Sequence, residues 1–164
     1  MVLRITAAAQ RRLREIQIQL LLARRAAELT QTSLSSLAGV STRALQAWEK
    51  GSDAPNVDHL LCWVRELGFR IVITESAGGS TAPMVAELQD GDSWEAREMR
   101  RLALPLRARR RERKLSQADL GLLIGVSRSS LQRWEDGNMF PRSIALIVWA
   151  DRLGYSVGLE PVDL

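Results

Sequence analysis

Apolar residues recur along the chain at the spacings typical of helices and, in two places, of strands. Leu13, Ile16 and Leu20 lie three to four positions apart, which predicts a long amphipathic helix near the start of the chain. In residues 69–74 and 155–160 the apolar positions alternate with others, which predicts two short strands. The hydrophobic pattern therefore predicts a mostly helical chain with a strand after each of two helical regions.

Polar and glycine positions divide each helical region into shorter helices. Thr30 is a good N-cap residue for a helix that ends at Gly39, where a left-handed backbone is least unfavourable for glycine. Ser41 caps the next helix, which ends before Gly51. The same signals return in the second region at Ser116, Gly125, Ser127 and Gly137. Each region therefore contains a helix, a tight turn and a second helix.

The two regions are copies of one unit. Residues 20–73 align without a gap to residues 106–159 at a constant offset of 86 positions, with 20 identities in 54 positions. Such self-similarity indicates a tandem duplication. We expect a first domain at residues 1–74, a flexible acidic connector at 75–92 and a second domain at 93–164.

The start of the second copy should differ from that of the first. Ser93 is a good N-cap residue, but Pro105 removes a backbone donor and should break or kink the helix that follows. We expect two helices here where the first copy has one long helix.

The charge of the chain favours a polyanionic partner. Lys and Arg number 23 against 19 acidic residues, and only Lys50 and Lys114 are lysines. Residues 97–152 hold 13 basic and six acidic residues. Arginine stays charged and binds phosphate or guanine through two parallel hydrogen bonds. A solvated helix face would have the same composition, so charge alone leaves both interpretations open.

Little in the sequence supports catalysis or metal binding. His59 and Cys62 are the only histidine and cysteine, and we expect both to be packing residues. We therefore expect no enzyme activity, no metal site and no cofactor. Without an apolar segment of bilayer length or a signal segment, we expect a cytoplasmic, nucleoid-associated protein with no membrane partner.

Both copies contain the pattern L-[ST]-Q-x-x-L-x-x-L-x-G-V-S-x-x-x-L-Q-x-W-E-x-G. This pattern resembles the lambda-repressor-like, or Xre-type, helix-turn-helix family of bacterial and phage regulators over about 54 residues of each copy. The resemblance implies an all-α fold of two tandem helix-turn-helix bundles, each followed by a short C-terminal β-strand able to pair with the other. It also implies a sequence-specific regulator of transcription that binds double-stranded DNA, which we expect to be a repressor.

The resemblance assigns roles to particular residues. Base-reading residues would lie near the start of the second helix of each motif and one turn later: Thr42, Arg43, Gln46, Ala47, Arg128, Ser129, Gln132 and Arg133. Residues that would contact phosphate are Gln31, Lys50, Gln117, Asn138 and Arg142. Two structural ion pairs would tie the first helix to the reading helix: Arg24 with Glu49, and Arg110 with Glu135. Gln46 and Gln132 could instead point to phosphate or solvent.

The same resemblance implies a small core in each copy. Its members would be Leu34, Leu37, Val40, Leu45 and Trp48, with Leu120, Leu123, Val126, Leu131 and Trp134 in the second copy. Stacking on bases is the alternative role for the tryptophans, but aromatic residues at helical spacing usually fill cores.

The arrangement of the copies and the partner stay open at this point. The strands could pair within one chain and make a monomeric pseudo-dimer, or exchange between two chains of a homodimer. Since the reading residues differ between copies, we expect an asymmetric or pseudo-palindromic operator, contacted more strongly by the second copy. The alternatives are an autoregulating antitoxin that also binds a protein toxin, a protein-interaction module, and a first copy that no longer contacts DNA.

Overall fold

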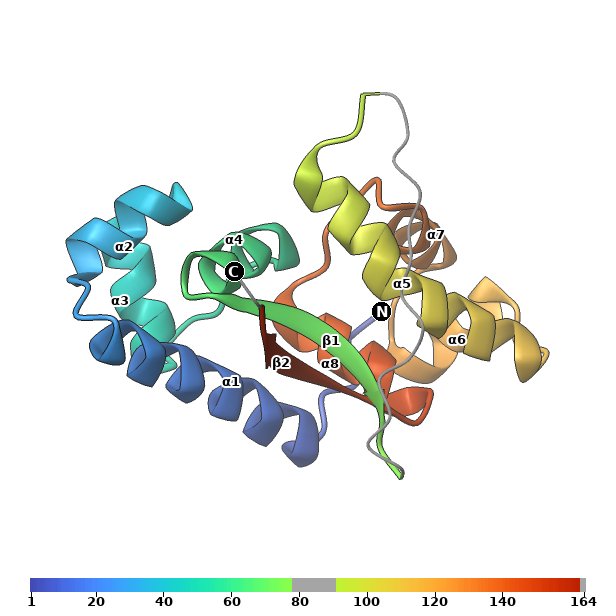
Figure 1. Ribbon diagram of the computed structural model, residues 1–164. Coiled ribbons are helices and arrows are strands. Elements are labelled where there is room, and N and C mark those ends of the chain that lie inside the picture. Colours follow the sequence, from blue (N-terminus) through green and yellow to red (C-terminus); the bar gives the residue numbers. More distant parts are fainter. Residues whose placement is uncertain (78–90, 163–164) are drawn as a thin grey trace.

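The computed structural model describes residues 1–77 and 91–162. These residues form eight helices and two strands, in the order α1 (Ala7–Ala26), α2 (Gln31–Ala38), α3 (Thr42–Lys50), α4 (Val57–Glu66), β1 (Phe69–Glu75), α5 (Trp94–Glu112), α6 (Gln117–Ile124), α7 (Arg128–Asp136), α8 (Ser143–Arg152) and β2 (Tyr155–Pro161) (Figure 1). The expected fold of two helix-turn-helix bundles with paired C-terminal strands is confirmed. Most of the predicted connector, residues 78–90, lies outside the described residues.

The helix ends follow the local signals of the sequence. The Thr30 and Ser41 hydroxyls accept hydrogen bonds from backbone N–H groups three residues later, at 3.0 Å in both cases. Gly39 and Gly125 have φ angles of +72° and +84°, so both turns use the left-handed backbone that favours glycine. Asp119 completes a reciprocal capping box with Ser116.

The two strands form one antiparallel sheet with a register that reveals the symmetry of the molecule. Val72 pairs with Gly158, and these residues are 86 positions apart, as are all equivalent residues of the two copies. Asn56 and Arg142 are equivalent in the same way and form an isolated antiparallel bridge. A residue that pairs with its own counterpart lies on a two-fold axis. The copies are therefore related by a pseudo-two-fold axis through both pairs.

The first helix of each copy packs on the other copy. Helix α1 contacts α8 and β2 as well as its own α3, while α5 contacts α4 and β1 as well as its own α7. Figure 1 shows the strand pair between α1 and α5. The Arg12 side chain donates to the Val157 carbonyl at 2.7 Å, and Arg101 donates to the equivalent carbonyl of Ile71 at 2.8 Å. The first helix of each copy therefore packs on both copies.

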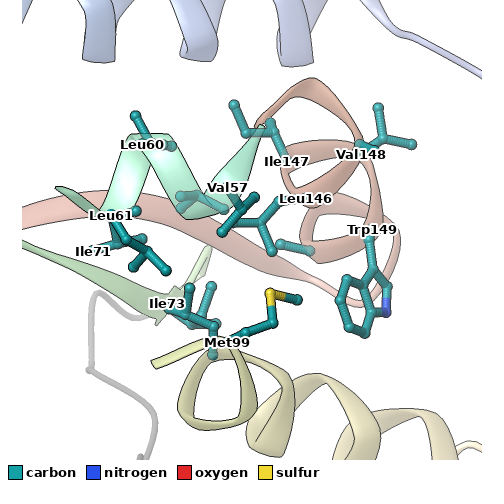
Figure 2. Close-up of a cluster of buried hydrophobic side chains, with 14 of the residues drawn as sticks. Val57, Leu60, Leu61, Ile71, Ile73, Met99, Leu146, Ile147, Val148 and Trp149 are labelled. Atoms are coloured by element: carbon teal, nitrogen blue, oxygen red, sulfur yellow. The ribbon is translucent and has the colours of Figure 1, made fainter. Parts of the chain in front are cut away.

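The hydrophobic core runs through both copies without a break. Leu60 from α4, Ile73 from β1 and Met99 from α5 belong to the same cluster as Leu146 and Trp149 from α8 (Figure 2). All five side chains are at most 2% exposed. The expected domain boundaries therefore mark sequence copies that share one core. No helix in the described part of the chain combines the length and apolar character needed to cross a bilayer.

Two expectations about local structure are wrong. Helix α5 runs through Pro105 without ending, so the second copy also begins with one long helix. Proline in a helix costs about 3 kcal/mol, but Pro105 is buried and the packing of α5 on both copies outweighs this loss. Leu37 is 57% exposed rather than part of the core, because Leu34 and Ala38 form the buried side of α2.

The N-terminal segment packs on the turn of the second motif. The Arg4 N–H donates to the Ile124 carbonyl at 2.9 Å. A Cβ atom added at Gly125 would lie 1.9 Å from the Val2 carbonyl oxygen, whereas one added at Gly39 meets nothing within 4 Å. Among residues 1–77 and 91–162, nothing covers the turn glycine of the first motif in this way.

This difference predicts unequal effects of two equivalent substitutions. Gly39→Ala should lower the free energy of unfolding by about 1 to 2 kcal/mol, because alanine is strained in the left-handed region. Gly125→Ala has the same strain and must also displace the N-terminal segment, so we expect a clearly larger loss. Urea unfolding of both variants measures the difference. Equal losses would show that the segment does not stabilise the turn.

Candidate DNA-binding interface

Helix α3 buries one side and presents the other to solvent. Leu45, Trp48 and Glu49 are at most 5% exposed. On the opposite side Arg43 and Gln46 are exposed. The other two expected base-reading residues, Thr42 and Ala47, are half-buried. The Thr42 hydroxyl lies 2.9 Å from the Ser35 hydroxyl on α2. The first copy therefore offers one arginine and one glutamine for base recognition.

Helix α7 presents a more basic surface. Its expected reading residues, Arg128, Ser129, Gln132 and Arg133, are all exposed. The N-cap hydroxyl of Ser127 accepts a hydrogen bond from the Ser130 N–H at 3.1 Å, which fixes the start of the helix. Two arginines and a glutamine thus project from one short, well-anchored helix, and these side chains are suited to guanine and adenine.

A buried ion pair holds each reading helix to the first helix of its own copy. Arg110 donates two hydrogen bonds to the Glu135 carboxylate, at 2.8 and 2.9 Å, and a third to the Leu115 carbonyl at 2.9 Å. Arg24 binds Glu49 in the same way at 2.6 and 3.0 Å. Both glutamates are 4% exposed. The geometry suits a structural role, because the carboxylates face inward.

The two glutamines expected to contact phosphate have another partner. The side-chain amide of Gln31 donates to Glu49 at 2.7 Å, and that of Gln117 donates to Glu135 at 3.0 Å. These amides therefore extend the ion pairs. In the first turns of α2 and α6 the Ser33 and Asp119 N–H groups donate to the cap hydroxyls of Thr30 and Ser116. The other first-turn N–H groups have no acceptor within their helices.

The other phosphate candidates lie at the ends of the reading helices and at the axis. Lys50 and Asn138 are exposed. Arg142 sits on the pseudo-two-fold axis, where its guanidinium lies 3.5 Å from the Asp53 carboxylate. Both side chains of this pair are more than half exposed, so the pair is weak and Arg142 can exchange Asp53 for another anion.

Many arginines of the basic region hold the fold rather than face solvent. Arg109 contacts the Glu75 carboxylate and the Leu153 carbonyl, and its guanidinium lies 4.2 Å from the centroid of the Tyr155 ring. Arg101 is 2% exposed, and burial lowers its pKa although Glu98 opposes the shift. The number of arginines able to reach a ligand is therefore smaller than composition suggests.

These internal contacts escaped the sequence analysis because they join residues far apart in the chain. Arg12, Arg101 and Arg109 each donate to a backbone carbonyl at least 30 positions away. Capping at α6 is local by contrast: the backbone N–H and hydroxyl of Ser116 bind the Asp119 carboxylate and lower its pKa.

The tryptophans of the motif belong to the core. Trp48 and Trp134 are 5% and 6% exposed. Their ring centroids lie 5.6 and 5.8 Å from those of Trp63 and Trp149, and in both pairs the rings are tilted. Buried aromatic pairs of this kind stabilise a core and leave no free ring face for a base.

Comparison with known proteins agrees with this geometry. A helix-turn-helix family model matches the chain twice, at residues 20–71 and 106–159. These two matches cover more than half of the chain and coincide with the two copies. No curated protein and no solved structure matches. The chain therefore belongs to the lambda-repressor-like, or Xre-type, helix-turn-helix family of DNA-binding regulators and carries two tandem copies of its domain.

Proposed function

We propose that this regulator is a repressor that binds its operator as a single-chain pseudo-dimer, with α3 and α7 in successive major grooves. The observation that carries the proposal is the pseudo-two-fold axis within one chain. A two-fold rotation keeps equivalent atoms at the same level along its axis. Helices α3 and α7 therefore lie at the same level along the axis, which would let both contact one face of DNA as the two halves of a dimeric repressor do.

The chain length between each reading helix and the axis fits this arrangement. Asn56, on the axis, follows the end of α3 at Lys50 by six residues, which reach about 20 Å at most. The same holds for Arg142 and the end of α7. The ends of the two helices are therefore no more than about 40 Å apart, a limit that includes the spacing of about 34 Å between successive major grooves.

The two half-sites of the operator should differ in sequence and strength. Helix α7 offers Arg128 and Arg133 where α3 offers Thr42 and Ala47. Because each bidentate contact to a base contributes about 1 to 3 kcal/mol of discrimination, the second copy should read its half-site more strictly. Occupation of such an operator would block transcription without a separate effector domain.

Salt dependence tests whether phosphate contacts supply the affinity. Four or more contacts predict a log–log slope steeper than about −3.6, and a loss of affinity of about a hundredfold between 50 and 200 mM salt. Fluorescence anisotropy with a labelled promoter fragment measures this slope. A nearly flat dependence would contradict DNA binding through these helices and favour a protein partner.

Arg133→Ala should weaken operator binding by about 1 to 3 kcal/mol and relax the choice at one base pair. Arg11→Ala is the control, because Arg11 is exposed on α1, away from both reading helices in sequence. Selection of bound oligonucleotides from a random pool, with parent and both variants, measures the operator, its asymmetry and the position affected. If the parent and Arg133→Ala select the same sequences, Arg133 does not read a base.

A further inference from the structure

A cavity of about 480 Å³ lies where the two copies meet. Its walls come from α4 and β1 of the first copy and from the first half of α5 of the second (Figure 1). Pockets that bind small molecules measure about 300 to 1,000 Å³. The cavity is therefore large enough for a small organic ligand, and such a ligand would touch both copies.

The charge of the cavity wall favours an anion. Four arginines line it, Arg65, Arg70, Arg97 and Arg101, against the single acidic residue Glu98. Arg101 is buried and bound to the Glu98 carboxylate at 2.8 Å and to the Ile71 carbonyl, so it belongs to the fold. Arg70 lies 3.6 Å from the same carboxylate, and Arg65 lies 3.9 Å from Glu66. Arg97 is exposed and has no ion-pair partner among residues 1–77 and 91–162. An incoming carboxylate would accept charge-assisted hydrogen bonds from Arg97.

The rest of the wall is apolar and partly aromatic. It is formed by Leu61, Val64, Phe69, Ile71 and Trp94, and Figure 2 shows Leu61 beside Ile71. The Arg65 guanidinium lies 4.0 Å from the centroid of the Trp94 ring, a distance typical of a cation–π contact. We propose that this cavity binds a small aromatic carboxylate, with its ring against the apolar wall and its carboxylate on Arg97.

The site is not a general consequence of the duplicated fold. On the opposite side of the pseudo-two-fold axis, the residues equivalent to Arg65 and Trp94 at the offset of 86 positions are Asp151 and Ala8. An aspartate would repel the carboxylate, and an alanine removes the aromatic surface. The chain has therefore built the anion-binding wall on one side of the pseudo-two-fold axis.

The position of the cavity connects it to a reading helix. Helix α5 forms one wall and is tied to α7 by the Arg110–Glu135 pair. A Cβ atom added at Gly137, which ends α7, would lie 2.6 Å from the Arg100 side chain of α5, so the two helices are in close contact. A ligand between α4 and α5 would favour one distance between these two helices. Because α5 is tied to α7, the ligand would thereby change the position of α7 and the affinity for the operator. This regulatory step rests on the proposed function, whereas ligand binding does not.

Calorimetric titration of the full chain without DNA tests the site directly. The probes are indole-3-propionate, its neutral amide and inorganic phosphate. We expect the carboxylate to bind at least about tenfold more tightly than the amide, as a charge-assisted hydrogen bond requires. Arg97→Gln should weaken carboxylate binding about fivefold or more, whereas Arg11→Gln, the same change at the equivalent position outside the cavity, should leave it within about twofold.

Several outcomes would overturn the proposal. These are no binding of the carboxylate, equal binding of acid and amide, phosphate binding as tight as that of the carboxylate, or equal effects of Arg97→Gln and Arg11→Gln. A repeat of the titration with operator DNA bound measures coupling, for which we expect an affinity change of about fivefold or more. If operator DNA leaves the affinity for the carboxylate unchanged, the binding site stands but its regulatory role is contradicted.

Discussion

The halves of the chain, residues 1–77 and 93–164, are expected to be unfolded when each is produced alone. Each half would lose the first helix that covers its fourth helix and the strand that pairs with its own. Ile73, Trp149 and the other residues of the shared core would then face water. A helix bundle of about 75 residues is only marginally stable even with a complete core. Circular dichroism should therefore show little helix and no cooperative melting for either half.

Mixing the two halves is the control. It shows whether each half is unfolded because it lacks the packing of the other half or because the chain was divided at an unsuitable residue. Equimolar halves should recover helical structure and a cooperative transition whose midpoint rises with concentration, because association is then part of folding. A single half that melts cooperatively with native helix content would contradict the shared core. It would show that each copy is an independent domain.

Glu135→Ala is expected to lower the free energy of unfolding by about 3 to 5 kcal/mol, the usual loss when one partner of a buried ion pair is removed. The substitution leaves the guanidinium of Arg110 buried without its carboxylate and also deprives Gln117 of its acceptor. For a chain of this size the melting temperature should fall by roughly 6 to 20 °C. Urea and thermal unfolding measure both quantities.

Two further variants check the cause. Asp136→Ala changes the neighbouring acid of α7, which is exposed, and should alter stability by no more than about 0.5 kcal/mol. Arg110→Ala should destabilise the chain about as much as Glu135→Ala, and the double variant should lose less than the two single losses combined. Additive losses would show that Arg110 and Glu135 act independently.

The helix-turn-helix units were predictable because their signals are local. Thr30, Gly39 and Ser41 each act on backbone groups within a few residues, and the offset of 86 repeats these signals in the second copy. The exposure of Arg43 was predictable for the same reason, because the apolar spacing of Leu45 and Trp48 on α3 leaves Arg43 on the other side.

The expectations from sequence that proved wrong concern positions where tertiary packing outweighs local preference. Pro105 disfavours a helix at its own position, yet α5 packs on α7 of its own copy and on α4 and β1 of the other. Leu37 has the spacing of a core residue, but no element of either copy covers it. Packing also gives Gln31 a contact that its position did not predict, because its amide binds a glutamate 18 positions away, and its contact with phosphate stays a prediction.

By itself the sequence determined the duplication, the ends of the helices, the two strands and the side chains that each reading helix presents, because all of these depend on neighbours in the chain. Only the tertiary structure decided that the first helix of each copy packs on both copies, that Val72 and Asn56 lie on a shared axis, and that four arginines line one cavity. Such features join segments about 30 to 145 positions apart. They depend on which surfaces fit together in space, and hydrophobic periodicity does not contain that information.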